Sequence, residues 1–181
     1  MKIAALQLCA SDDPVANLAL TVSMVRQAAE AGAQFIATPE VTNCVSSSRR
    51  RQNEVLALQE DDETLAAMCA AAARFGVWIS VGSLALKLPD DDRFTNRSFM
   101  IDPSGQIVAQ YDKIHMFDVT LSETEQYRES DGYRAGDHAV IADTAFGKIG
   151  MTICYDIRFP HLYRGLAKSG ASILLIPAAF A

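Results

Sequence analysis

The sequence has little that would mark a secreted, membrane-spanning or nucleic-acid-binding protein. Its 181 residues include only four cysteines, none of them in a CxxC pair, so we expect neither a disulfide framework nor a structural zinc site. No run approaches the roughly 18 apolar residues that a membrane-spanning helix needs, and the net charge of −6 provides no basic surface for nucleic acid. Because a signal peptide is also lacking, these absences indicate a protein of the reducing cytoplasm.

The composition that remains is that of an ordinary folded domain. Half of the residues are hydrophobic and 21% are charged, with ten glycines and six prolines. We expect one domain over residues 1–181. The basic cluster Arg49–Arg51 lies between three serines and an acidic run at 60–63, so it is expected to form a solvated loop. The glycosylation sequon at Asn96 is expected to be idle, because glycosylation requires secretion.

Short β-favouring runs alternate with helical periodicity, which predicts an α/β fold. Residues 114–137 have no convincing periodicity and are interpreted as a loop that covers a site. Cys69 lies on the apolar face of a predicted helix and is expected to pack in the core. The expected helices are 14–31, 62–75 and 160–169, and the expected strands are 2–8, 35–41, 77–86, a hairpin within 97–112, a second hairpin within 138–154, and 172–181.

A thiol lies at a strand-to-helix turn near the end of the chain. Gly147 and Gly150 flank a β-favouring run that ends at Cys154, and Pro160 stands where the next helix can begin. In an open α/β sheet, ligands and catalytic groups gather at such strand ends. Free cysteine is also among the most buried residue types, so the turn alone leaves a catalytic role and a core role equally open.

Two other reactive side chains occupy comparable positions. Glu40 and Lys113 each come at the end of a predicted strand. Parallel strands would bring these ends to one edge of a sheet together with Cys154. A thiol needs a base to become a strong nucleophile, and an ammonium group can stabilise the oxyanion formed on an acyl carbon. The sequence therefore predicts Cys154 as nucleophile, Glu40 as base and Lys113 as electrophilic stabiliser; for Glu40 alone, helix capping or solvent exposure is the alternative.

Three motifs occur in a fixed order: TPE at 38–40, YDKIHMF at 111–117, and GKIGMTICYDIRFPHLYRGLAKSGA at 147–171. This combination resembles the nitrilase superfamily of carbon–nitrogen hydrolases, and is most similar to its Nit branch of ω-amidase-like and deaminated-glutathione-amidase-like enzymes. The resemblance implies the same three catalytic roles, an αββα sandwich assembled as homodimers or larger homo-oligomers, a small-molecule amide substrate, and no metal or organic cofactor.

The resemblance also implies two further site residues and a longer chain. The backbone N–H of Tyr155 would be a second oxyanion donor. Glu129 would match a second family glutamate that orients the lysine or the substrate, with Glu123 and Glu125 in the same loop as rivals. Family members continue beyond the last strand of this sequence, so the sandwich is expected to be incomplete at its C-terminus, and the 181-residue piece alone is expected to be poorly soluble or inactive.

The substrate is indicated less directly. Arg158 lies four residues past Cys154, and its guanidinium could bind a substrate carboxylate through a bidentate pair. This agrees with the resemblance to enzymes that act on ω-amides of dicarboxylates or on deaminated glutathione. The alternative for Arg158 is a structural pair with Asp156 or another acid, and the alternative activity is hydrolysis of an N-carbamoyl amide.

Two other hypotheses stay open from the sequence. In a Cys–His hydrolase the base for Cys154 would be His115, His138 or His161, but the placement of Glu40 and Lys113 would then be unexplained. A catalytically inactive scaffold or regulatory subunit would keep the fold without the activity. The intact set of glutamate, lysine and cysteine argues against this second hypothesis.

Overall fold

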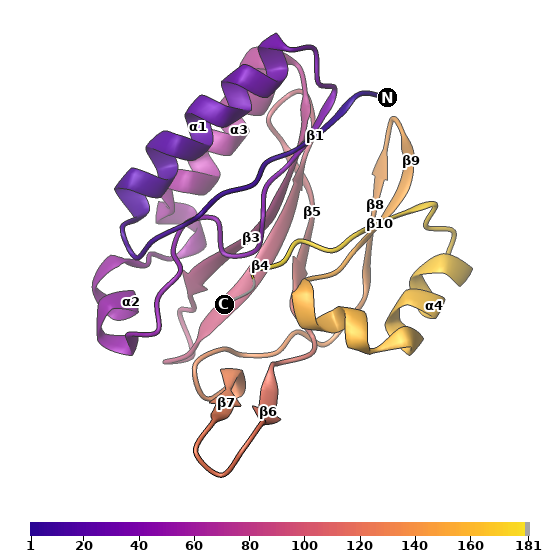
Figure 1. The fold of residues 1–181 in the computed structure, drawn as a ribbon. Coiled ribbons are helices and arrows are strands. Elements are labelled where there is room, and N and C mark those ends of the chain that lie inside the picture. The colour runs from indigo at the N-terminus through magenta and orange to yellow at the C-terminus, as the bar shows by residue number, and fades with distance from the viewer. Residues whose placement is uncertain (180–181) are drawn as a thin grey trace.

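Within residues 1–179, which the computed structural model describes, the chain forms four layers (Figure 1). Two helices cover a five-stranded sheet, a three-stranded sheet packs on its other face, and a last helix lies beyond it. This arrangement confirms the predicted α/β class and αββα layering. The elements are β1 (Ile3–Ala5), α1 (Pro14–Glu30), β2 (Phe35–Ala37), α2 (Arg49–Val55), η1 (Gln59–Asp61), α3 (Glu63–Phe75), β3 (Trp78–Lys87), β4 (Phe94–Ile101), β5 (Ile107–Asp112), β6 (Asp118–Thr120), β7 (Gln126–Arg128), η2 (Glu129–Asp131), β8 (Val140–Thr144), β9 (Gly147–Met151), η3 (Cys154–Arg158), α4 (Pro160–Lys168) and β10 (Ile173–Leu175).

Local signals explain why the two outer helices begin and end where they do. The Asp13 carboxylate accepts hydrogen bonds from the first backbone N–H groups of α1, and Asp62 does the same for α3. Gly76 ends α3 in the left-handed conformation that glycine adopts without strain. Both helices pack their apolar faces on the first sheet, where Met68 is fully buried and Cys69 is partly buried against the core, as expected.

The direction of the strands in the first sheet places two candidate residues at the same end. The strand order is β1-β2-β3-β4-β5; β1, β2 and β3 are parallel, and β4 is antiparallel to both of its neighbours. Strand β5 therefore runs in the same direction as β2. Glu40 follows β2 and Lys113 follows β5, so both lie at the same end of this sheet, as the sequence predicts.

Cys154 comes from the other sheet, which corrects the expectation of a single sheet edge. The order there is β10-β9-β8, and the segment that bears Cys154 follows β9. The two sheets meet face to face over a buried cluster that includes Tyr111 from β5 and Ile149 from β9. A short run of β-favouring residues has the same sequence pattern whichever sheet it joins. The sequence therefore does not tell which strands pair.

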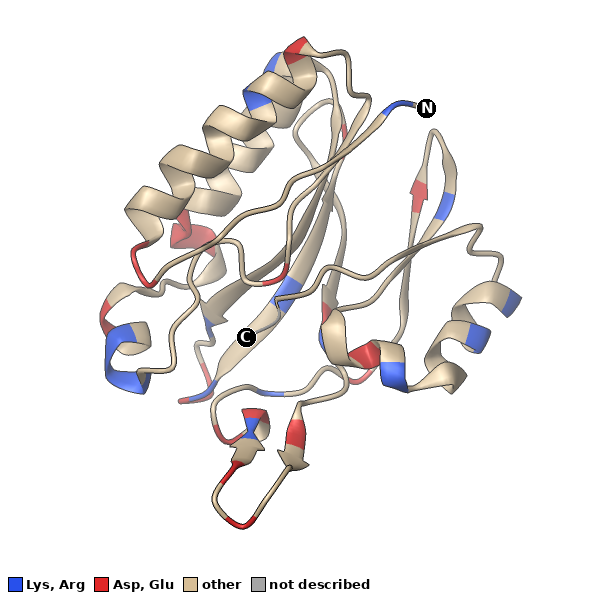
Figure 2. Cartoon of the chain, viewed as in Figure 1, with Lys and Arg blue, Asp and Glu red and all other residues tan. Residues whose placement is uncertain are grey.

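Five segments differ from the sequence-based expectation. Arg49–Arg51 does not form a loop but begins α2, capped by Ser48 (Figure 2). The Arg49 guanidinium lies 3.8 Å from the centre of the Phe94 ring. Residues 114–137 contain the hairpin β6–β7, which extends from the body of the molecule and carries acidic residues at its tip (Figures 1 and 2). The strands β1, β2 and β10 are each only three residues long, and so shorter than the expected strands 2–8, 35–41 and 172–181. Residues 180–181 of the predicted last strand lie outside the described residues. No helix in the described part of the chain is long and apolar enough to cross a membrane.

Candidate active site

Glu40 is held by a tight contact between its loop and strand β3. The strand bulges between Val81 and Leu84, and there the backbone N–H of Gly82 donates to Thr38 Oγ1 at 3.0 Å. A side-chain carbon on Gly82 would stand only 2.1 Å from the Thr38 carbonyl oxygen, so this approach requires glycine. The Glu40 side chain is buried, with only 6% of its surface exposed. The loop therefore fixes a carboxylate in the interior rather than in solvent or at a helix cap.

The residue after Glu40 has a strained backbone. Val41 adopts a φ of 44°, which is a rare conformation for a β-branched residue. Its N–H donates to Ser83 Oγ at 2.8 Å, and the N–H of Thr42 donates to the Ser83 carbonyl at 2.9 Å. The bulge in β3 thus supplies the partners that hold this conformation.

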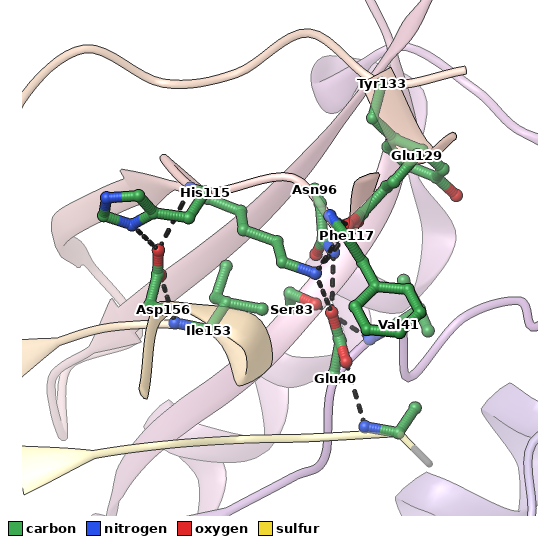
Figure 3. Close-up of polar contacts among 12 residues, drawn as sticks. Glu40, Val41, Ser83, Asn96, His115, Phe117, Glu129, Tyr133, Ile153 and Asp156 are labelled. Carbon is green, nitrogen blue, oxygen red and sulfur yellow. Dashed lines mark hydrogen bonds and ion pairs between the residues drawn. The ribbon is translucent and has the colours of Figure 1, made fainter. Parts of the chain in front are cut away.

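The Lys113 ammonium group lies between two carboxylates. Its Nζ donates to Glu40 Oε1 at 3.0 Å and to both oxygens of Glu129 at 2.9 and 3.0 Å (Figure 3). Burial alone would lower the pKa of the Lys113 amine, but the charges of Glu40 and Glu129 outweigh this effect and raise the pKa above its ordinary value. Lys113 is therefore a positively charged donor in an interior site.

Of the three glutamates in the long loop, Glu129 is the one that contacts the lysine. It begins η2 at the base of the hairpin, and the Phe117 N–H donates to its Oε2 at 2.6 Å. Glu123 and Glu125 are exposed on the hairpin, where Glu125 accepts a hydrogen bond from Tyr127. The hairpin, which the sequence left without structure, is what carries Glu129 back to Lys113.

Cys154 is the second residue of the chain with a positive φ outside glycine, at 44°. It is the first residue of η3, and its N–H donates to the Pro177 carbonyl at 2.9 Å. Burial and the adjacent negative charge of Glu40 raise the pKa of the Cys154 thiol to about 11, although Lys113 opposes this shift. The thiol is thus protonated at neutral pH and needs a base before it can act as a nucleophile.

Asp156, to which the sequence assigned no role in the site, joins the segments around Lys113 and Cys154. It is completely buried and accepts a hydrogen bond from Tyr111 Oη at 2.7 Å. It also accepts from His115 Nδ1 at 2.7 Å and from the N–H of Ile153 at 2.8 Å (Figure 3). Tyr111 and His115 lie two residues on either side of Lys113, and Asp156 lies two residues after Cys154. The only signal of this connection in the sequence is an aspartate in the turn that follows Cys154.

The histidines suggested as bases engage other partners. His115 is bonded to Asp156, and its ring stacks on Phe159 with 3.7 Å between ring centres. His138 is exposed and contacts Asp137, and His161 is exposed on α4. Within residues 1–179, the structure places Glu40 rather than a histidine next to Cys154.

Tyr155 and Arg158 lie on η3. The Tyr155 ring packs against Phe117 and Phe159, and its N–H belongs to the first turn, where backbone N–H groups have no partner within the helix. Arg158 is exposed, and Asp156 is bonded to other groups, so the structural pair of Arg158 with Asp156 does not form. The geometry leaves the guanidinium available to a ligand.

A groove of about 680 Å³ opens beside Glu40 between residues 5–10 and 175–179. Glu40 lines it, whereas Lys113 and Cys154 do not, so the groove reaches only one side of the candidate site. The residues that the structure describes contain no group of three or more His, Cys, Asp or Glu side chains placed to bind a metal ion.

The sequence profile of the family described as carbon-nitrogen hydrolase matches residues 2–180. The chain belongs to this family. It is 40% identical over 181 residues to the deaminated glutathione amidase of Yersinia enterocolitica, an alignment that covers 98% of this chain and 62% of that enzyme. It is 29% identical over 185 residues to the omega-amidase NIT3 of Saccharomyces cerevisiae, covering 99% and 64% of the two chains.

Solved structures support the same assignment. The Caenorhabditis elegans NitFhit protein superposes with a TM-score of 0.91 at 30% identity over 99% of this chain and 44% of its own. Yeast Nit3, described as a member of branch 10 of the nitrilase superfamily, superposes with a TM-score of 0.84 at 25% identity, over 99% and 65% of the two chains. The predicted resemblance to the Nit branch of the carbon–nitrogen hydrolases is confirmed. The chain spans less than two thirds of the length of these relatives.

Proposed function

We propose that this carbon–nitrogen hydrolase is an amidase that acts through Cys154, Glu40 and Lys113. The observation that carries the proposal is the buried Lys113 ammonium group, within 3.0 Å of Glu40 and next to a thiol that is protonated at rest. An acyl-transfer reaction needs a nucleophile, a base for its proton and a fixed positive donor for the oxyanion. These three groups come from two sheets and meet in one buried place.

In the first half-reaction, the Cys154 sulfur attacks the amide carbon while its proton passes to Glu40. The carbonyl oxygen gains a negative charge, which Lys113 and the N–H of Tyr155 stabilise. When the tetrahedral intermediate collapses, the carbon–nitrogen bond breaks and the leaving amine takes the proton from Glu40. The product of this half-reaction is a thioester on Cys154 and free ammonia or amine.

In the second half-reaction, water replaces the amine. Glu40 takes a proton from the water as it attacks the thioester carbon, the same donors stabilise the second oxyanion, and the carbon–sulfur bond breaks. The thiolate of Cys154 recovers its proton from Glu40, and a carboxylic acid leaves. Glu129 holds Lys113 through both steps by its two hydrogen bonds to the ammonium group.

For the substrate, we infer a small ω-amide or a deaminated-glutathione-type amide that carries a carboxylate. The support is the exposed guanidinium of Arg158 on the same short helix as Cys154, and the names of the relatives at 40% and 29% identity.

Ammonia release from succinamate, N-carbamoylglycine and 3-cyanopropanoate tests this proposal. We expect turnover of succinamate and its loss in Cys154→Ala. In Arg158→Ala, we expect KM to rise more for succinamate than for a neutral amide. Turnover in Cys154→Ala would contradict the mechanism, and an equal rise of KM for acidic and neutral amides would contradict the role of Arg158. Preference for N-carbamoylglycine would identify an N-carbamoyl amide hydrolase, and no turnover of any amide would favour an inactive scaffold.

A further inference from the structure

We propose that Asn96 is a positioning residue that makes Glu40 act as a base through one carboxylate oxygen, Oε2. This inference rests on the proposed function, in which Glu40 takes the proton of Cys154. Asn96 lies on β4, is only 2% exposed, and donates from Nδ2 to Glu40 Oε1 at 2.9 Å (Figure 3). Its backbone carbonyl accepts from the N–H of Lys113 at 3.0 Å. One residue thus contacts both the base and the lysine.

The two oxygens of Glu40 differ in how many donors they face. A carboxylate oxygen has two lone-pair positions. Oε1 accepts from both Asn96 Nδ2 and Lys113 Nζ, which fill these positions. Within residues 1–179, Oε2 accepts one hydrogen bond, from the N–H of Ala179 at 2.9 Å. The oxygen that keeps a lone pair for a proton is therefore Oε2.

The Cys154 thiol lies near both Glu40 and the segment that donates to Oε2. Glu40 raises the pKa of this thiol, and the N–H of Ala179, which donates to Oε2 at 2.9 Å, lowers it. We therefore place the thiol on the side of Oε2. Because the two oxygens of a carboxylate are equivalent, a half-turn of Glu40 about its last torsion changes nothing, but a partial turn would direct the free lone pair away from the thiol. The donation from Asn96 opposes a partial turn because it holds one oxygen of the carboxylate in place.

The amide oxygen of Asn96 indicates what fixes the orientation of its side chain. Its Oδ1 is buried and has no hydrogen-bond partner in the described part of the chain. A buried unsatisfied oxygen is costly, and a flipped amide would point Oδ1 at the negatively charged Glu40. The orientation is thus set by the single bond to the carboxylate. Because an amide donor carries no charge, it fixes Glu40 without adding a second positive charge that would weaken the base.

The test measures kcat and KM for succinamate in Asn96→Ala and in the nearly isosteric Asn96→Asp. Loss of a hydrogen bond to a charged group is expected to lower kcat/KM about 10- to 100-fold. Because Asn96 acts through Glu40, the loss should fall on kcat and leave KM nearly unchanged. The loss should be larger in Asn96→Asp, which places a second carboxylate against Glu40.

The matched control is Asn43→Ala. Asn43 is also a buried asparagine that donates to a carboxylate, Asp62, at 3.1 Å, but its side chain contacts Asp62 and the backbone of Ala85 rather than a residue of the candidate site. This variant should melt at a lower temperature while its kcat and KM stay at wild-type values.

The outcomes separate the two proposals. If Glu40→Gln keeps wild-type turnover, the proposed function fails. If Glu40→Gln is inactive but both Asn96 variants keep the wild-type kcat, only the role of Asn96 fails. If neither Asn96 variant folds, Asn96 serves stability and the positioning role is likewise rejected.

Discussion

Replacing Gly82 with alanine should damage the site from a distance, without touching any reacting group. The new methyl carbon would stand 2.1 Å from the Thr38 carbonyl oxygen and 2.4 Å from that of Pro39. Both atoms are backbone, so they cannot be moved by a change of rotamer. The loop that ends in Glu40 must therefore shift away from β3.

The size of the shift follows from van der Waals geometry. An ordinary contact between a carbon and a carbonyl oxygen needs roughly 3.4 Å, so the loop must move by about 1 Å. A misplacement of about 1 Å in a catalytic group can cost about 100-fold in rate. Crowding of this kind also lowers the free energy of unfolding by about 1–3 kcal/mol. We expect kcat for succinamate to fall about 100-fold in a protein that is still folded at 25 °C.

The control for Gly82→Ala is Gly165→Ala in α4. A methyl group on Gly165 meets nothing within 4 Å, and alanine is favoured over glycine within a helix, so this variant should be as active as the wild type and at least as stable. Steady-state kinetics and urea denaturation of the two variants give the comparison. If Gly82→Ala folds and its kcat stays within about twofold of Gly165→Ala, the tight contact does not position Glu40 and the reasoning is wrong.

Three other predictions follow from the charges and hydrogen bonds of the site. Glu129→Gln removes one of the charges that raise the pKa of Lys113, so the ammonium group should be lost at lower pH and the basic limb of the kcat profile should move down. Glu40→Gln removes a negative charge that raises the pKa of the Cys154 thiol to about 11, so the pH dependence of Cys154 alkylation, followed by peptide mass spectrometry, should move to lower pH; no movement would mean that burial alone sets the shift. Asp156→Ala leaves the buried donors of Tyr111 and Ile153, and the partly buried His115, without an acceptor. Urea denaturation should therefore show a loss of about 3 kcal/mol or more, and a loss below about 1 kcal/mol would contradict a connecting role.

The parts of the fold that the sequence predicted correctly have strong local signals. Asp13 and Asp62 mark the starts of α1 and α3 by hydrogen bonds to nearby N–H groups, and Gly76 marks the end of α3 by its left-handed backbone. The position of Glu40 was also predictable, because Pro39 and Glu40 interrupt an apolar strand. In each case the physical cause lies inside the segment being predicted.

The missed parts have causes that lie elsewhere in the chain. Helix α2 has few apolar residues and so no periodic stripe, but Arg49 packs on Phe94 from β4. Asn96 looks like an unremarkable polar residue in a strand, since its acceptor is 56 positions away. Pairing of short strands into two sheets depends on such long-range contacts, which is why a single edge was expected for three residues that come from two sheets.

The strained backbone at this site indicates that the packing of the two sheets determines the geometry of the site. Val41 and Cys154 both have a φ of 44°, and each adjoins or bears a proposed reacting group. Such conformations cost about 1–3 kcal/mol each and persist only where surrounding bonds hold them. Val41 is held from β3 by Ser83, and Cys154 from the segment after β10 by Pro177. Each strained residue is held by a different sheet, so the distance between the Glu40 carboxylate and the Cys154 thiol is set by how the two sheets pack. Substitutions between the sheets should therefore lower activity even when they leave both sheets folded.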